Sequence, residues 1–280
     1  MKVVATIAEL RSHLAASVGP IGAVPTMGAL HAGHVSLIER ARSESATVVA
    51  SIFVNPLQFG RHEDLDLYPR PLESDAQKAA DAGVDLLFTP SVSEMCPEPM
   101  LTVVSVASIA SRLEGASRPG HFDGVATVVA KLFAIFGPCS AYFGEKDYQQ
   151  LAVIRRMASD LAMPVRVVAC PTVREPDGLA LSSRNVFLSP EQRAGAPVLH
   201  RALVAGREAV GKGEREASKV HDVMAKMVAR EPLIALDYAE AVDTSTFETP
   251  ADLTTSEHGI RLLIAARFGT VRLIDNISCS

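Results

Sequence analysis

Residues 21–34 read IGAVPTMGALHAGH, and within this stretch an apolar run gives way to small and polar residues. The run at residues 21–26 is typical of a short buried strand. His31 and His34 are three residues apart, so a helix that begins here would place both imidazoles on one face of its first turn. We therefore predict a strand followed directly by a helix, the arrangement from which α/β folds are built.

The start of this predicted helix has the features of a phosphate-binding site. A helix N-terminus carries unpaired N–H groups and a partial positive charge, and both attract anions. Gly33 would let a ribose or a base approach the backbone, because a larger side chain there would intrude. The sequence has neither a GxGxxG loop after this strand nor a GxxxxGK[ST] loop, so nucleotide binding would depend on the His-x-Gly-His segment itself. The alternative is a capped loop with two solvated histidines.

The neighbouring segments continue the alternation of strands and helices. Strand-like apolar runs occupy residues 47–54, 84–90, 141–144 and 163–172. Helical patterns run over residues 34–45, 71–83, 125–136 and 151–161. Apolar strands separated by helices indicate a parallel sheet covered on both faces, which binds ligands at the carboxyl ends of its strands. A site is therefore expected in the loops that directly follow strands, namely PTMG, VNPLQFG, FGEKD and PTVRE.

The character of the chain changes after about residue 175. Residues 190–230 are mainly helical in pattern, and the later segments LDYAEAV, RLLIAARF and TVRLID are strand-like. We predict an α/β domain over residues 1–175 and a smaller α+β domain over residues 176–280.

Composition and charge limit the classes of function. The 280-residue chain has a formal net charge of −5 and a pI near 5.9, so it lacks the overall basic charge that is typical of nucleic-acid-binding proteins. Its four cysteines are widely scattered and form no CxxC or Cys/His metal-binding pattern. Charges interrupt the apolar run at residues 1–17, which resembles neither a signal peptide nor a membrane span. We expect a cytoplasmic protein without nucleic-acid or membrane partners, and we assign no residue to a metal site.

Two later loops carry cations and hydroxyl groups that suit phosphate. In GLALSSRN, residues 178–185, a glycine begins the loop and two serines and Arg184 follow it. This combination suits the β- and γ-phosphates of a triphosphate. FGEKDYQQL at residues 143–151 adds Lys146 as a point charge, with Asp147 as a candidate helix N-cap. The alternatives are a serine-rich turn and an ordinary capped helix with a surface lysine.

Amide side chains form the candidate site for a second substrate. Asn55 and Gln58 lie in a loop after a predicted buried strand, and Gln150 falls four residues after Lys146. Amides both donate and accept hydrogen bonds, so they can recognise a hydroxyl or a carboxylate. The alternative is that each glutamine is an ordinary surface residue. In SRPGHFDGV, Asp123 is expected to cap the apolar helix that follows.

Taken together, six segments resemble those of the pantothenate synthetases in order and spacing: PTMGALHAGH, SIFVNPLQFG, YPR, RPGHFDGV, FGEKDYQQL and PTVREPDGLALSSRN. The resemblance covers residues 20–190. Members of that family join pantoate to β-alanine with ATP, and they release AMP and pyrophosphate. The resemblance implies a Rossmann-like nucleotidyltransferase domain, a pantoyl-adenylate intermediate, Mg²⁺ accompanying the triphosphate, and a homodimer.

The same resemblance assigns roles to individual residues. It implies that His34 is the catalytic acid and that His31, Lys146 and Arg184 also take part in catalysis. The residues implied to contact ATP are Met27, Gly28, Ala29, Leu30, His31, Ala32, Gly33 and His34 in the first loop, Gly144, Glu145, Lys146 and Asp147 in the second, Val173 near the adenine, and Leu181, Ser182, Ser183 and Arg184 around the phosphates.

The resemblance also covers the second substrate site. Gln58 and Gln150 match glutamines that bind pantoate, Gln58 is further implied for β-alanine, and Asn55 completes the candidate set. Two positions depart from the family pattern. Leu181 stands where methionine is frequent, a nearly volume-conserving change. Ala32 stands where an acidic residue is common, at a position expected to face away from ATP.

Three other functions share part of this pattern. A different nucleotidyltransferase would also carry His-x-Gly-His and would act on another small acid or on a phosphate acceptor, for which a basic site is expected. A class I aminoacyl-tRNA synthetase would need a tRNA-binding domain, for which this chain leaves little room. A nucleotide sensor would not need both phosphate loops. A reactive adenylate also requires a closed cleft, so we expect the C-terminal domain or a loop to close over the site.

Overall fold

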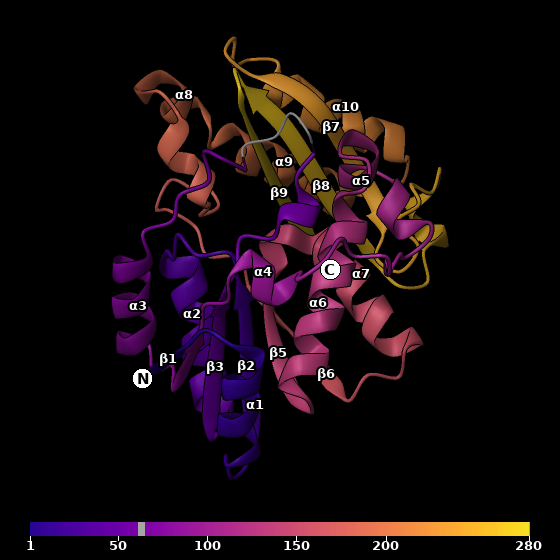
Figure 1. The fold of residues 1–280 in the computed structure, drawn as a ribbon. Coiled ribbons are helices and arrows are strands. Elements are labelled where there is room, and N and C mark those ends of the chain that lie inside the picture. The colour runs from indigo at the N-terminus through magenta and orange to yellow at the C-terminus, as the bar shows by residue number, and fades with distance from the viewer. Residues whose placement is uncertain (61–64, 280) are drawn as a thin grey trace. The chain divides into compact units, whose positions relative to one another are not determined.

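The computed structural model describes residues 1–60 and 65–279. The chain divides into two compact units, each of which is described here by itself. The first unit contains residues 1–145 and 149–171, and the second contains residues 146–148 and 172–280. Both are drawn in Figure 1. The three residues 146–148 thus interrupt the first unit in sequence and belong to the second by their contacts.

Within the described residues, the first unit contains a six-stranded sheet in the order β1-β4-β3-β2-β5-β6, and each pairing between neighbours is parallel. The strands are β1 Lys2–Val4, β2 Ile21–Thr26, β3 Thr47–Ile52, β4 Leu86–Phe88, β5 Cys139–Gly144 and β6 Val165–Cys170. The strand order reverses between β2 and β5, and the carboxyl ends of strands at such a reversal are where doubly wound sheets bind ligands. The prediction of a parallel α/β sheet is confirmed.

Helices cover both faces of this sheet. The helices of the first unit are α1 Ile7–Ala15, α2 Ala32–Glu44, α3 Leu72–Asp81, α4 Val92–Met95, α5 Glu114–Ser117, α6 His121–Phe136 and α7 Tyr148–Asp160. Tyr142 and Phe143 are adjacent in β5, so their side chains point to opposite faces. Tyr142 packs in a buried cluster with Ile38 of α2, whereas Phe143 contacts Phe133 of α6 edge to face. The helices α2 and α6 therefore lie on opposite faces (Figure 1).

The second unit has an antiparallel sheet with helices and matches the predicted α+β character. Its strands are β7 Ala235–Asp243, β8 Ile260–Phe268 and β9 Val271–Ser278, in that order across the sheet. Its helices are α8 Pro190–Gly195, α9 Val198–Gly211 and α10 Ala217–Val228. One buried apolar cluster joins α9 and α10 to the sheet through side chains such as Leu203, Val220 and Leu262.

Several local predictions are corrected by the structure. The helix expected at residues 34–45 begins two residues earlier, at Ala32, because His31 acts as its N-cap. Asp123 does not cap α6: the helix begins at His121 after Gly120, and Asp123 lies in the first turn, where its charge still favours the helix dipole. By contrast, Asp147 stands directly before α7, where the prediction of an N-cap places it, and it is the last residue of a 3₁₀ turn, Glu145–Asp147. The strand β1 was not predicted, because its three residues carry too short a pattern.

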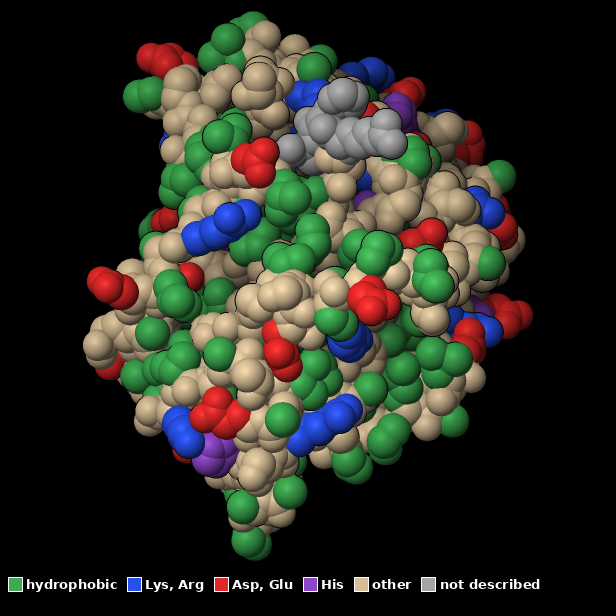
Figure 2. Space-filling view, in the orientation of Figure 1, with side chains coloured by type: hydrophobic (Ala, Val, Ile, Leu, Met, Phe, Trp, Pro, Cys, Tyr) green, Lys and Arg blue, Asp and Glu red, His purple; other side chains and the backbone are tan. Residues whose placement is uncertain are grey.

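Two surface properties complete the description. No helix in the described part of the chain is long and apolar enough to cross a membrane. On the face shown in Figure 2, Lys and Arg side chains lie singly among acidic, polar and apolar ones, so this face carries no continuous basic surface.

Candidate active site

The loop between β2 and α2 is bent by two consecutive residues with positive φ. Gly28 has a φ of 85° and Ala29 a φ of 50°, both in the left-handed region. The Thr26 hydroxyl lies at the end of β2, where it donates to the Ser51 carbonyl at 2.7 Å and accepts from the Gly28 N–H at 3.2 Å. Hydrogen bonds therefore define this turn before the helix begins.

Two residues of α3 hold the next part of the same loop. The fully buried Asp75 carboxylate accepts the Ala29 N–H at Oδ2 and the Leu30 N–H at Oδ1, each at 2.7 Å. Lys78 donates from Nζ to the Leu30 carbonyl at 2.7 Å. Neither residue can be found from the sequence, because ESDAQK reads as an ordinary exposed helix and no local pattern shows which face meets the loop.

His31 and His34 cap the helix that carries them. His31 Nδ1 accepts from the Gly33 N–H at 3.1 Å, and His34 Nδ1 accepts from the His31 N–H at 3.4 Å. The ring centroids are 4.2 Å apart, so both rings share the first turn, as their spacing predicts. Because a backbone N–H can only donate, each neutral ring carries its hydrogen on Nε2. Each neutral imidazole therefore carries an Nε2–H group close to a helix N-terminus, and such an N-terminus favours phosphate.

The amides Asn55 and Gln58 lie against the same loop. Asn55 is buried; its Oδ1 accepts from the Leu57 N–H at 3.0 Å, and its Nδ2 donates to Gln58 Oε1 and to the Gly124 carbonyl, each at 3.1 Å. Gln58 Nε2 in turn lies 3.0 Å from Met27 Sδ. The structure thus brings Asn55 and Gln58 together beside Met27.

The N-terminus of α6 supports the backbone of Gln58. His121 Nδ1 donates to the Gln58 carbonyl at 2.8 Å, and Arg118 Nη2 donates to the same oxygen at 3.3 Å. Because the carbonyl can only accept, the neutral His121 ring carries its hydrogen on Nδ1, and its Nε2 accepts from Arg118 Nη1 at 3.0 Å. These residues fix where the Gln58 side chain begins.

The two neighbouring glutamines of α7 differ in role. Gln149 is buried, donates to the carbonyls of Ile109 and Arg112 at 2.7 and 2.8 Å, and accepts from the Glu114 N–H at 3.1 Å. Gln150 is half-buried, and its side chain makes no hydrogen bond to any described residue. Burial in the folded structure distinguishes these two glutamines, whereas the sequence pattern alone does not.

The second unit holds the remaining cations and hydroxyl groups predicted for the site. Lys146 Nζ lies 3.5 Å from Asp147 Oδ1. The Leu181 N–H donates to the Val173 carbonyl at 3.0 Å. Ser182 is the N-cap of a 3₁₀ turn, Ser183–Phe187, and its Oγ accepts from the Arg184 N–H at 3.3 Å.

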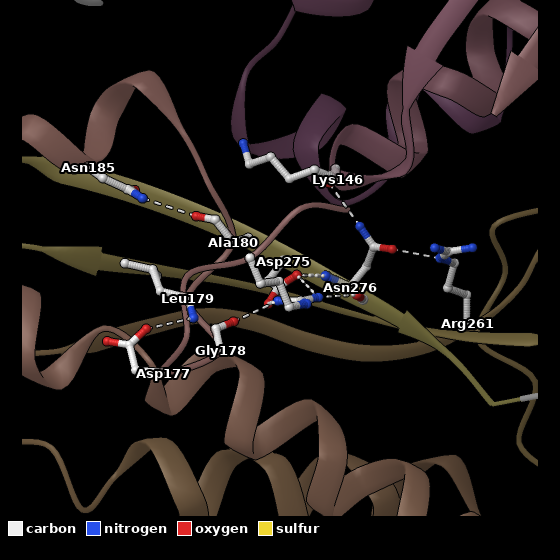
Figure 3. Close-up of polar contacts among 10 residues, drawn as sticks. Lys146, Asp177, Gly178, Leu179, Ala180, Asn185, Arg261, Asp275 and Asn276 are labelled. Carbon is white, nitrogen blue, oxygen red and sulfur yellow. Dashed lines mark hydrogen bonds and ion pairs between the residues drawn. The ribbon is translucent and has the colours of Figure 1, made fainter. Parts of the chain in front are cut away.

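These segments of the second unit meet closely. A cavity of about 10 Å³ is lined by Lys146, Leu179, Ala180, Ser182, Asn185, Leu199, Leu273, Ile274 and Asp275. That volume holds one water molecule at most. Figure 3 shows the polar contacts around it. Nearby, burial lowers the pKa of His200, and the charge of Arg174 lowers it further.

The predicted site residues therefore form two groups, each ordered within its own unit. The first unit holds the loop at residues 27–34, the amides, and Gly144 and Glu145 at the end of β5. The second unit holds Lys146, Asp147, Val173 and the segment 181–184. Among residues 1–60 and 65–279, no group of three or more His, Cys, Asp or Glu side chains could hold a metal ion.

The chain matches a known family along nearly its whole length. The family model described as pantoate-beta-alanine ligase matches residues 2–278. The pantothenate synthetase of Thermus thermophilus is 54% identical over 280 residues, which are 99% of this chain and 99% of the relative. That of Roseiflexus sp. RS-1 is 52% identical over 276 residues, which are 99% of this chain and 98% of the relative.

Solved structures agree with this match. The crystal structure of pantothenate synthetase from Thermus thermophilus superposes with a TM-score of 0.94 at 52% identity, covering 100% of this chain and 99% of that one. The pantoate-beta-alanine ligase from Francisella tularensis, complexed with beta-gamma ATP and beta-alanine, gives a TM-score of 0.80 at 35% identity, with 100% and 98% coverage.

Proposed function

This chain belongs to the pantoate-β-alanine ligase family and joins pantoate to β-alanine, and we propose that the reaction runs through a pantoyl adenylate made from ATP. A carboxylate is a poor acylating agent until its oxygen carries a good leaving group. In the first step a pantoate carboxylate oxygen attacks the α-phosphorus of ATP, and pyrophosphate leaves. In the second step the β-alanine amine attacks the acyl carbon, an amide bond forms, AMP leaves and the amine loses a proton.

One observation carries the assignment of the nucleotide site: His31 and His34 share the first turn of α2, and each neutral ring has its hydrogen on Nε2. The turn follows β2, at the reversal of strand order. Donors at this position stabilise charge that develops on phosphate oxygens. We assign His34 as the catalytic acid, with the loop at residues 27–34 around ATP. The complex of the Francisella relative with beta-gamma ATP supports ATP as the nucleotide.

The second unit supplies the groups that we assign to the triphosphate. Lys146 provides a point charge, and Arg184 a planar guanidinium that can bind two phosphate oxygens at once. The hydroxyls of Ser182 and Ser183 add donors next to Arg184. Mg²⁺ usually binds through substrate phosphates with one or two carboxylates rather than in an all-protein cage. We therefore assign it to the triphosphate, where it would neutralise the leaving pyrophosphate.

The amides of the first unit suit the acid substrate. Pantoate is a small branched acid with two hydroxyl groups, and amide side chains can bind both its hydroxyls and its carboxylate. Gln58 lies against Met27 of the nucleotide loop, so an acid held by Gln58 would sit beside the assigned ATP site. We assign Asn55, Gln58 and Gln150 to pantoate, with Gln58 also contacting β-alanine. Cationic side chains at this site would also bind other anions, whereas neutral amides would not.

Further properties complete the proposal. We infer a homodimer in the cytoplasm, and a cleft that closes by movement of the C-terminal unit or of a loop. Closure would protect the mixed anhydride from water, because an exposed acyl adenylate hydrolyses. Val173, Gly144, Glu145 and Asp147 are assigned to contacts with ATP.

Pantoate-dependent exchange of labelled pyrophosphate into ATP tests the two-step reaction. We expect exchange with pantoate alone, without β-alanine, because adenylate formation reverses before the amine is needed. Amino acids and phosphorylated acceptors should give no exchange. Exchange that requires β-alanine would contradict a free adenylate step and would favour a concerted transfer.

A further inference from the structure

The strand β9 makes a buried ion pair with the loop that leads to the assigned phosphate segment. Asp275 accepts from Arg174 Nη1 at 2.6 Å and from Nη2 at 2.8 Å, and its side chain is only 3% exposed. Arg174 also donates to the carbonyls of Gly178 at 3.0 Å and Asn276 at 3.3 Å. A planar guanidinium with four such bonds holds its loop in one orientation.

This loop is a short hairpin that ends where the phosphate segment begins. Arg174 pairs with Ala180 in an antiparallel bridge, and the Leu181 N–H donates to the Val173 carbonyl. Asn185 Nδ2 returns to the Ala180 carbonyl at 3.0 Å from the other side of the segment (Figure 3). Fixing Arg174 therefore fixes the start of the segment 181–184.

The next residue of β9 holds the other assigned phosphate segment. Asn276 is 3% exposed, and its Nδ2 donates to the Lys146 carbonyl at 2.9 Å (Figure 3). Its Oδ1 accepts from Arg261 Nε at 2.6 Å, and the Arg261 guanidinium stacks 3.8 Å above the ring centre of Tyr148. The short segment 146–148 is thus held by its backbone at one end and by an aromatic ring at the other.

We propose that Asp275 and Asn276 are positioning residues, which hold the segments around Lys146 and Arg184 at a fixed separation for the triphosphate. The proposal rests on the function assigned above to Lys146 and Arg184. Asp275 binds the loop before residues 181–184, and the adjacent Asn276 binds the segment 146–148. Neither segment can therefore shift without disturbing β9. The cavity between the segments has room for one water molecule at most, so little slack remains. Both Asp275 oxygens are engaged by Arg174, so this carboxylate acts through its partner.

The expected consequence is selective for the adenylation step. A misplacement of about 1 Å at a reacting group can cost about a hundredfold in rate. Asn276→Ala should therefore lower pantoate-dependent ATP–pyrophosphate exchange about 10- to 100-fold. Conversion of preformed pantoyl adenylate and β-alanine to pantothenate should change less than about threefold, because that step no longer handles the pyrophosphate group.

Double-mutant cycles show which segment each residue acts through. If Asn276 works through Lys146, then Asn276→Ala should lower pyrophosphate exchange little further in a Lys146→Ala background. In an Arg184→Ala background it should lower exchange almost as much as it does alone. Asp275→Asn should show the opposite pattern. If Asp275→Asn does not fold, the Asn276 cycle decides alone. Asp237→Asn is the matched control, because it breaks the 2.8 Å ion pair with Arg272 of the same strand without touching either segment.

The outcomes separate this inference from the assigned function. Unchanged exchange in Lys146→Ala and Arg184→Ala would overturn the phosphate roles themselves. Losses in those two variants with normal exchange in Asn276→Ala would overturn only the positioning role. Equal losses in both half-reactions for Asn276→Ala, matching those of Asp237→Asn, would reduce Asn276 to a stabilising residue and would also overturn it.

Discussion

Gly124 of α6 lies so close to Leu57 that a Cβ atom at position 124 would be 2.1 Å from the Leu57 carbonyl oxygen. The same atom would lie 2.7 Å from the Gln58 N–H nitrogen, and the Gly124 carbonyl accepts from Asn55. Only glycine allows the helix to approach this loop backbone so closely. The contact sets the position of Asn55 and Gln58, two of the three amides that we assign to pantoate.

Gly124→Ala should consequently displace the loop that carries Gln58. Overpacking of this kind costs about 1–3 kcal/mol of folding stability. We expect the KM for pantoate to rise more than the KM for ATP, as measured by steady-state kinetics with each substrate varied. Gly211→Ala is the control, because a Cβ there meets open space. Equal changes in both KM values would contradict a link between Gly124 and the acid site.

His34→Ala should fold normally and lose most of its activity. Its hydrogen bond to the His31 N–H is long, at 3.4 Å, so the lost cap costs about 1 kcal/mol or less. Loss of one transition-state donor typically lowers the rate by about 10²–10³. The kcat of the purified variant, with urea unfolding alongside, checks both statements. His13→Ala on α1 is the control. Near-normal turnover of His34→Ala would show that His34 is not a catalytic residue.

Lys146→Ala and Arg184→Ala should fail mainly in the first half-reaction. Both side chains are assigned to the triphosphate, whereas the second step uses pantoyl adenylate and an amine. Preformed pantoyl adenylate should therefore restore much of the pantothenate formed by each variant, measured in a single turnover. If the second half-reaction falls as far as the first, the two cations do more than bind phosphate.

Asp75→Asn should impair the nucleotide loop from a distance. The amide has one acceptor oxygen for two N–H donors, so Ala29 or Leu30 would face an N–H group instead of a carboxylate oxygen. A hydrogen bond to a charged group contributes about 1.5–3 kcal/mol. We expect the free energy of unfolding, measured with urea, to fall by that amount. The kcat should also fall, because the loop sets the position of His31. Asp81→Asn, an exposed change on the same helix, should alter neither quantity.

The sequence predicts much of this arrangement because the signals are local. Continuous apolar runs separated by helical patterns lead directly to the parallel sheet, and the spacing of His31 and His34 leads to their shared turn. The contacts that hold the site are not local. Arg174 and Asp275 are 101 residues apart, and Asp75 meets a loop 45 residues earlier. No periodicity within either segment reveals such a partner.

Gln149 and Gln150 provide a test in which each residue serves as the control for the other. They are adjacent in α7, yet Gln149 is buried with three backbone partners, and Gln150 is half-buried with none among the described residues. Gln149→Ala should therefore lower stability, by about 1–3 kcal/mol for each buried partner that it leaves unpaired. Gln150→Ala should leave the unfolding free energy almost unchanged.

For the KM of pantoate the order should be reversed: Gln150→Ala should have the larger effect and Gln149→Ala the smaller. If Gln150 binds the pantoate carboxylate, its removal costs a hydrogen bond to an ionised group, worth about 1.5–3 kcal/mol, or about ten- to a hundredfold in the KM for pantoate. A site whose amides need hydroxyl partners also rejects acids that lack them, so discrimination against such analogues should weaken in the same variant. The KM for ATP should stay within a few-fold. Equal increases for ATP and pantoate in Gln150→Ala would exclude Gln150 from the acid site and leave Gln58 and Asn55 to select the substrate.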